Sequence, residues 1–189
     1  MSQTAAKPMT LAEFFAFQET EDVRYELVNG QPLRMMAGAA RVHNAITINV
    51  VSELRSRLRG SGCVPFNGDD GVETYPGQIR RPDAGIDCGK TDRRGLHVEE
   101  PRVIIEVLSP STRDFDTLGK LGEYEAIASV HTVLLIDPDE PNVLVRRRTK
   151  EGWWGQRLTG LDDEIAISNP DLALPLAAIY EDIAFPDPS

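Results

Sequence analysis

The chain has 189 residues, 41% of them hydrophobic and 26% charged, which predicts one globular domain over residues 1–189 and excludes a largely disordered chain. No apolar run approaches the roughly 20 residues that cross a bilayer, and residues 1–8 carry no signal-peptide pattern, so we expect a cytoplasmic protein without membrane contact. The formal net charge of −10 disfavours broad binding to nucleic acid, because such proteins usually present a basic surface.

The first part of the chain has helix and hairpin patterns in turn. Thr10 and Glu13 have the spacing of a capping box, which predicts a helix from residue 11. The dipeptide at residues 29–30 is Asn-Gly, which favours the positive φ angles of a two-residue turn, so residues 24–36 are expected to form a β-hairpin. Between residues 42 and 59 an apolar residue recurs every four positions, which is typical of an amphipathic helix.

The middle of the chain predicts a sheet with a crossover. Residues 64–86 have the pattern of short strands separated by glycine and proline turns. Residues 103–108 are apolar on both sides of the pleat except at Glu106, as in a strand covered on both faces. A helical pattern at residues 112–128 separates this run from a second apolar run at residues 130–137. The order strand, helix, strand predicts a crossover between neighbouring parallel strands.

The last part of the chain predicts a second hairpin, over residues 142–158, and a short closing helix over residues 176–183. The whole pattern indicates an α/β fold with a mixed central sheet flanked by helices and an N-terminal β-hairpin. Basic residues cluster at positions 80–81, 93–94 and 146–148, either as a positive strip or as solvated strand positions. For the triple arginine we favour the second interpretation, because charge runs usually mark solvated faces.

The two cysteines, Cys63 and Cys88, do not have the spacing of a metal-binding motif, and the three histidines are scattered. A zinc site built from neighbouring residues is therefore not expected. In a cytoplasmic protein both cysteines are expected to be reduced, partly buried thiols.

Two carboxylates have unusual neighbours for their charge, because Asp83 and Glu106 each lie in a strand-like run. A carboxylate in an apolar strand is costly to desolvate unless a cation, a hydrogen-bond donor or a proton compensates it. A hard divalent metal ion bound by both is the simplest compensation, and the backbone carbonyl of Val107 is a further candidate ligand. Lys120, in the following helix, is a candidate for orienting a water molecule or offsetting transition-state charge.

Each of these residues also has a purely structural interpretation. Asp83 follows a proline and could cap a turn, which is the commoner role for an aspartate at such a position. Lys120 lies four residues after Asp116, which is the spacing of an ordinary surface ion pair on a helix. Glu106 is harder to explain in this way, because its apolar neighbours predict burial and a buried glutamate without a stabilising role is rare.

In order and spacing, these residues resemble the Uma-two group of restriction endonucleases within the PD-(D/E)xK nuclease superfamily. The resemblance extends over residues 11–147 and rests on segments 24–30, 81–83, 105–113 and 135–138 with Asp116, Lys120 and Tyr124. It implies a restriction-endonuclease-like core, a Mg²⁺ (or Mn²⁺) ion and cleavage of phosphodiester bonds. The superfamily motif places a lysine two residues after the second acid, where this chain has Leu108. In the Uma-two pattern the following helix supplies that lysine, which corresponds to Lys120.

The resemblance also implies a set of site residues. Asp83, Glu106, Lys120 and Glu26 are the catalytic candidates, and Asp83, Glu106 and the Val107 carbonyl are the metal-ligand candidates. Glu26 matches an acidic residue of the family's early hairpin, either as a further ligand or as a residue that positions the lysine. His43 also matches the family pattern, but a lone histidine at a helix start is more often a structural or solvent contact.

The leading hypothesis is a Mg²⁺-dependent endodeoxyribonuclease whose binding to DNA is weak or narrowly targeted, given the negative charge, and which acts as a homodimer. The alternative is a catalytically inactive nuclease-fold scaffold or regulatory interaction protein, which the charge and the missing DNA-binding domain favour. Intact acids and lysine argue against it, because a scaffold has no need for buried like charges. A two-carboxylate glycosidase fits less well, because it leaves the lysine unexplained.

Overall fold

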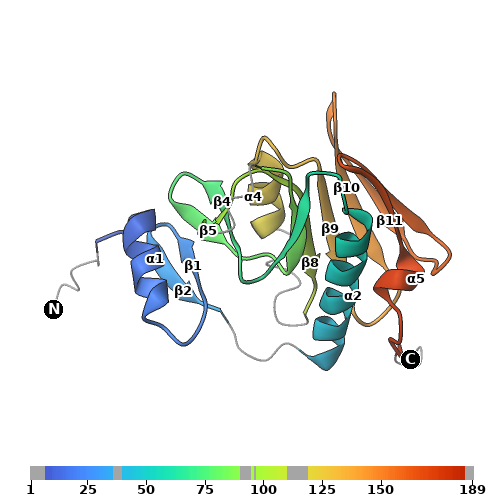
Figure 1. Cartoon of the computed structure of the whole chain (residues 1–189), viewed down its shortest axis with the longest axis horizontal. Helices are drawn as coiled ribbons and strands as arrows, with labels where there is room; N and C mark the ends of the chain where they lie inside the picture. The colour runs from blue at the N-terminus through green and yellow to red at the C-terminus, as the bar shows by residue number, and fades with distance from the viewer. Residues whose placement is uncertain (1–6, 36–39, 90–94, 96, 110–118, 186–189) are drawn as a thin grey trace.

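The structure, a computed structural model, describes residues 7–35, 40–89, 95, 97–109 and 119–185, and three groups of strands organise it (Figure 1). The helices are α1 (Leu11–Glu19), α2 (Arg41–Arg57), α4 (Leu121–Ala126) and α5 (Leu176–Ile179). The strands are β1 (Tyr25–Val28), β2 (Gln31–Arg34), β3 (Val64–Asn67), β4 (Gly71–Tyr75), β5 (Gln78–Arg80), β6 (Ala84–Asp87), β7 (His97–Val98), β8 (Pro101–Val107), β9 (Thr132–Ile136), β10 (Val143–Thr149), β11 (Gly152–Leu158), β12 (Glu164–Ser168) and β13 (Asp171–Pro175).

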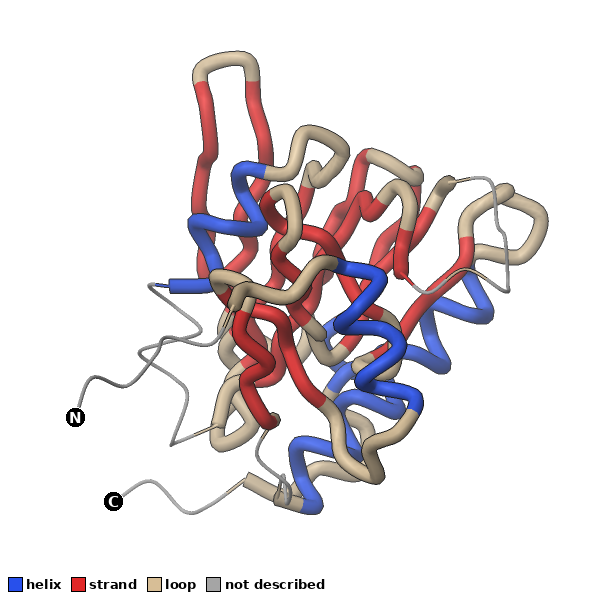
Figure 2. The backbone as a smooth tube through the Cα atoms, turned by 90° about the vertical axis from the view of Figure 1, so that its left-hand side faces the viewer, coloured by secondary structure: helices blue, strands red, loops and turns tan. Residues whose placement is uncertain are grey.

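The central sheet is mixed and has the strand order β11-β10-β9-β8-β6-β3. Its middle strands β8 and β9 are parallel, which confirms the predicted crossover, and the other neighbours are antiparallel. A second sheet has the order β2-β1-β5-β4-β7, and β12 pairs with β13 alone. The hairpin of β10 and β11 projects beyond the rest of the molecule (Figures 1 and 2). The predicted α/β fold is thus confirmed.

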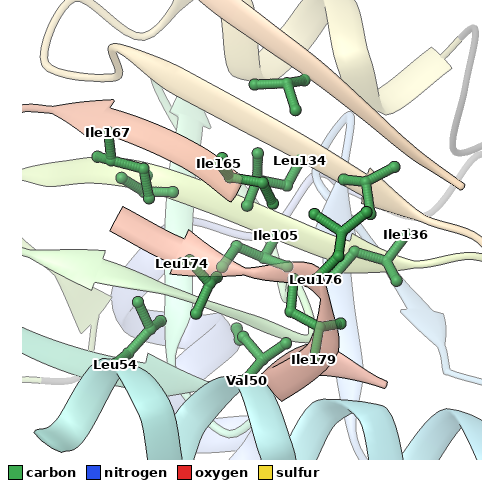
Figure 3. Packing of buried hydrophobic residues seen from close by; sticks show 14 of the residues in the cluster. Val50, Leu54, Ile105, Leu134, Ile136, Ile165, Ile167, Leu174, Leu176 and Ile179 are labelled. Carbon is green, nitrogen blue, oxygen red and sulfur yellow. The ribbon is translucent and has the colours of Figure 1, made fainter. Parts of the chain in front are cut away.

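Helices cover both faces of the middle strands. Alternate residues of β8 and β9 point to opposite sides, so each face offers apolar side chains for a helix to pack on. On one face, Val50 and Leu54 of α2 pack with Ile105, and the β12–β13 hairpin and α5 complete that layer (Figure 3). On the other face, Tyr124 of α4 packs with Ile104 of β8. The strand pair β8–β9 is therefore enclosed on both sides, as its nearly continuous apolar sequence predicted.

Local sequence signals are confirmed where they depend on backbone geometry. The Thr10 and Glu13 side chains form the capping box of α1. Asn29 and Gly30 have φ angles of 52° and 74°, so the turn between β1 and β2 adopts the positive φ values that Asn-Gly favours. Helix α2 and the β10–β11 hairpin also lie where they were expected.

Three features differ from what the sequence predicted, and the helix predicted at 112–128 is described only in part. The helix expected at 112–128 is described as α4, Leu121–Ala126, and positions 110–118 lie outside the described residues. The closing helix is only the four residues of α5. The hairpin β12–β13 was not predicted, although its strand β12 alternates between exposed and buried positions. Asp83 precedes β6 instead of lying within it.

Among the described residues, no helix is both long and apolar enough to cross a membrane.

The prediction of two reduced thiols is wrong, because Cys63 and Cys88 form a disulfide. The antiparallel register of β3 and β6 pairs Val64 with Asp87, so the next step along the ladder sets the two cysteines opposite each other. They are separated by 25 residues in sequence, and only strand pairing brings them together. The bond therefore ties the edge strand β3 to β6.

Removing this bond is expected to destabilise the protein. A disulfide that closes a loop of 25 residues contributes about 3 kcal/mol by restricting the unfolded chain. The double variant C63S/C88S should lose roughly this much unfolding free energy in urea melts. Dithiothreitol should lower the urea midpoint of the parent protein and leave that of the double variant unchanged. Two reactive thiols in parent protein that has been unfolded without reductant would contradict the disulfide.

Candidate active site

Glu106 lies near the carboxyl end of β8, in the middle of the central sheet, and is only 4% exposed. The neighbouring strand β6 runs antiparallel, and its register pairs Ala84 with Ile105. One further step along this ladder brings Asp83 beside Glu106. The strand pairing therefore carries the two sequence-predicted acids to the same edge of the sheet.

Two side chains from the region of α4 contact the Glu106 carboxylate. The Lys120 Nζ atom lies 3.7 Å from Glu106 Oε1, and the Tyr124 hydroxyl donates a hydrogen bond of 2.6 Å to the same oxygen. Lys120 and Tyr124 are four residues apart, so they lie on one face of the helix. Burial and the nearby charges of Glu106 and Glu26 raise the pKa of Tyr124 well above its ordinary value, so its hydroxyl stays protonated.

Glu26 of β1 is the partner of Lys120 on the side of the second sheet. Its Oε1 atom lies 3.2 Å from Lys120 Nζ and accepts a hydrogen bond of 3.1 Å from the backbone N–H of Arg81. Its Oε2 atom accepts a hydrogen bond of 2.9 Å from Arg80 Nη1. Both carboxylate oxygens of Glu26 are thus bound by groups of the protein. This geometry holds the Lys120 ammonium group between Glu26 and Glu106.

Arg80 joins Glu26 to α4. Its guanidinium is 3% exposed and donates to Glu123 through Nε at 2.8 Å and Nη2 at 2.6 Å, in addition to the bond with Glu26. Burial by itself would lower the pKa of Arg80, but the carboxylates of Glu123 and Glu26 more than offset that effect and raise it. Burial likewise favours a higher pKa for Glu123, but the bonds from Arg80 and Thr74 lower it below its ordinary value.

Asp83 has partners on the α2 side. Its Oδ2 atom accepts a hydrogen bond of 2.8 Å from the backbone N–H of Val107 and lies 3.2 Å from His43 Nε2. Burial of the His43 ring favours a lower pKa, but the hydrogen bond and charge of Asp83, with a bond to the Val107 backbone, raise the pKa overall. His43, which was given low weight from sequence, is therefore in direct contact with a candidate ligand.

The structure brings Glu106, Lys120 and Glu26 into one buried cluster, and it links Asp83 to the Val107 backbone beside that cluster. Over the described part of the chain, no three His, Cys, Asp or Glu side chains are grouped so as to hold a metal ion. The donor chemistry nevertheless fits a hard divalent cation, because Asp83, Glu106 and the Val107 carbonyl offer only oxygen atoms.

Sequence reasoning missed two members of this cluster and underrated a third. Arg80 was grouped with Arg81 in a basic surface cluster, but both side chains are buried. Glu123 had no distinguishing signal, because an exposed glutamate is common in a helix. Tyr124 was part of the family resemblance, but its pattern also fits a packing residue. Only the pairing of strands far apart in sequence shows that the three side chains share one cluster.

Replacing Arg80 should be severely destabilising, because it leaves the carboxylates of Glu26 and Glu123 buried without their shared cation. We expect R80M to lose about 3–5 kcal/mol of unfolding free energy in urea melts. The matched control is R157M, since Arg157 is exposed and should lose less than about 0.5 kcal/mol. A loss of the same size in both variants would contradict this interpretation of the cluster.

Glu123 should also make stability depend on pH. Its pKa is lower in the folded protein than the ordinary value of 4.5, so its contribution is present above that value and is lost as pH falls through the folded pKa. The parent protein should therefore exceed E123Q in unfolding free energy at pH 7, and the difference should shrink below pH 4. A constant difference across this range, measured by urea melts at each pH, would show that the Glu123 charge does not contribute.

The sequence matches one family model and is similar to two known proteins. Residues 11–177 match the family model Uma2, the Uma-two group, which is described as "putative restriction endonuclease". Two uncharacterized proteins of Synechocystis sp. are similar: one is 24% identical over 92% of this chain and 92% of its own length, and the other is 30% identical over 72% and 79%.

A solved structure has the same fold. It is the crystal structure of a protein from Anabaena variabilis described as "a putative nuclease belonging to DUF820". The TM-score is 0.70 at 21% identity, and the alignment covers 92% of this chain and 98% of the other. This likeness confirms the restriction-endonuclease-like fold that the sequence predicted.

Proposed function

Because this chain belongs to the Uma2 family, we propose that it is an endonuclease that hydrolyses phosphodiester bonds in DNA and depends on Mg²⁺ or Mn²⁺. The observation that carries the proposal is the contact of Lys120 with Glu106, a carboxylate buried at the end of a central strand. Ionisable groups held in a buried environment with a specific charge partner cluster at functional sites. The register that brings Asp83 beside Glu106 supports the same assignment.

Asp83, Glu106 and the Val107 carbonyl would hold the divalent ion. When bound, such an ion lowers the pKa of a water molecule and neutralises charge on the phosphate. Lys120 would orient the attacking water and offset the negative charge that develops on the phosphate oxygens. Glu26 would hold the ammonium group of Lys120 in place, because both of its oxygens are already bound within the protein.

The cluster also supports the proposal that residues 1–189 act as one domain. Glu26 belongs to the small sheet, and its partner Lys120 contacts Glu106 of the central sheet. The two sheets therefore contribute to one site, and neither would assemble it without the other. Separate domains with a mobile interface would not maintain ion pairs of this length.

Binding to DNA is proposed to be weak or narrowly targeted. The net charge is −10, and the buried guanidinium groups of Arg80 and Arg81 are not available to contact phosphates. A homodimer is part of the proposal, since two copies would offer one site to each strand of a duplex. Each copy would then need only a small contact surface.

One observation favours the alternative of a catalytically inactive scaffold. The Asp83 Oδ2 atom is bound by the Val107 N–H and lies beside His43, so it is already stabilised without a metal ion. Titration calorimetry with Mn²⁺ separates the two proposals. An active nuclease should show binding heat that D83N abolishes, and a scaffold should show none.

The decisive experiment is cleavage of supercoiled plasmid by purified protein in the presence of Mg²⁺ or Mn²⁺. The variants D83N, E106Q and K120M should each lower the rate about 100-fold or more, because each removes charge needed at the reacting phosphate. The matched control is E151Q, which removes a carboxylate at the exposed tip of the β10–β11 hairpin and should cleave at the parent rate. Equal nicking by all of these proteins would mean that the activity does not come from this site.

A further inference from the structure

The Tyr124 side chain links the apolar core to the Glu106 carboxylate of the candidate site. We propose that Tyr124 is a positioning residue that keeps the Glu106 carboxylate from closing onto Lys120 and so orients this carboxylate toward a metal ion. The proposal rests on the function proposed above and concerns the organisation of the same site. It follows from the lengths of three contacts and from the packing of one ring.

The three contacts show that Glu106 and Lys120 each lie closer to a third group than to one another. Glu106 Oε1 is 2.6 Å from the Tyr124 hydroxyl and 3.7 Å from Lys120 Nζ. Lys120 Nζ is 3.2 Å from Glu26 Oε1. Buried opposite charges that face each other would ordinarily close to hydrogen-bond distance, because their attraction is strong in a low dielectric. Tyr124 binds the anion and Glu26 binds the cation, and the two groups form only a loose contact of 3.7 Å.

The Tyr124 ring is fixed by the core, so its hydroxyl acts from a fixed point. Tyr124 is fully buried, and its ring packs in the apolar cluster that contains Ile104, Val133 and Leu135. A buried tyrosine hydroxyl needs a hydrogen-bond partner, and here the partner is Glu106. A tyrosine hydroxyl is ordinarily protonated at neutral pH, so it remains a donor there.

Packing alone does not account for a tyrosine at this position. A phenylalanine would fill nearly the same volume without placing a hydroxyl among buried groups. The hydroxyl adds one hydrogen bond to one carboxylate oxygen, which restricts where that oxygen can lie. A ligand that is oriented in advance loses less freedom when it binds a cation.

The first test is the binding of Mn²⁺ to Y124F, measured by titration calorimetry. Loss of the hydroxyl should let Glu106 pair with Lys120, and the Kd for Mn²⁺ should rise about 10- to 100-fold, as for other groups that orient metal ligands. Cleavage should then need more metal for half-maximal rate and recover at saturating metal. The matched control is Y180F, which removes a hydroxyl that donates to the Asp137 carbonyl at 2.9 Å, and its Kd should equal that of the parent.

The second test is the double variant K120M/Y124F. If Tyr124 acts by holding Glu106 away from Lys120, removal of the Lys120 charge should restore most of the Mn²⁺ affinity that Y124F loses. A merely structural tyrosine predicts the opposite, since two core substitutions should bind Mn²⁺ more weakly than one. A crystal structure of Y124F should also show a Glu106–Lys120 distance shorter than 3.7 Å.

The outcomes separate this inference from the proposed function. If the parent protein binds Mn²⁺ and cleaves DNA but Y124F has the same Kd, the role of Tyr124 is overturned and the nuclease proposal stands. Should the parent protein neither bind Mn²⁺ nor cleave, both fail together. If Y124F is too unstable to titrate, the comparison moves to the K120M background, where K120M and K120M/Y124F should bind Mn²⁺ with nearly the same Kd, and a clearly weaker K120M/Y124F would overturn the positioning role.

Discussion

The contact between the Glu106 carboxylate, the Tyr124 hydroxyl and the Lys120 ammonium group is the interaction on which the candidate site depends. Glu106 occupies a strand that is covered on both faces, so its charge has little access to bulk water. An ionised carboxylate persists in such a place only when donors and cations compensate it. The region of α4 supplies both, through the Tyr124 hydroxyl and the Lys120 ammonium group.

Each buried charge in this cluster is paired with a group of opposite charge, and that group is itself buried and needs a further partner. Lys120 is buried with Glu106 and needs a second carboxylate, which Glu26 provides from the small sheet. Glu26 in turn binds Arg80, and Arg80 binds Glu123 of α4. The chain of ion pairs starts and ends on the same helix. It therefore couples the position of the N-terminal hairpin to the geometry of the site, although the two are far apart in sequence.

Local sequence signals predicted the secondary-structure elements well, and they predicted the contacts between distant segments less well. The Asn29-Gly30 turn, the capping box of α1 and the parallel pair β8–β9 depend on neighbouring residues or on long apolar patterns, and all are confirmed. The burial of Arg80 and the disulfide between Cys63 and Cys88 depend on strand pairing between distant segments. No spacing within the sequence carries that information, so both were misjudged.

The sequence by itself determined that Glu106 would be buried, because its neighbours are apolar on both sides of a central strand, and that Asp83 and Lys120 match a nuclease family. Only the tertiary structure decided which charges meet. It placed Glu26 against Lys120, His43 against Asp83, and Tyr124 between the core and Glu106. The physical reason is that burial follows from local composition, whereas an ion pair requires two groups within a few ångströms, and that distance is set by the pairing of strands and the packing of helices upon them.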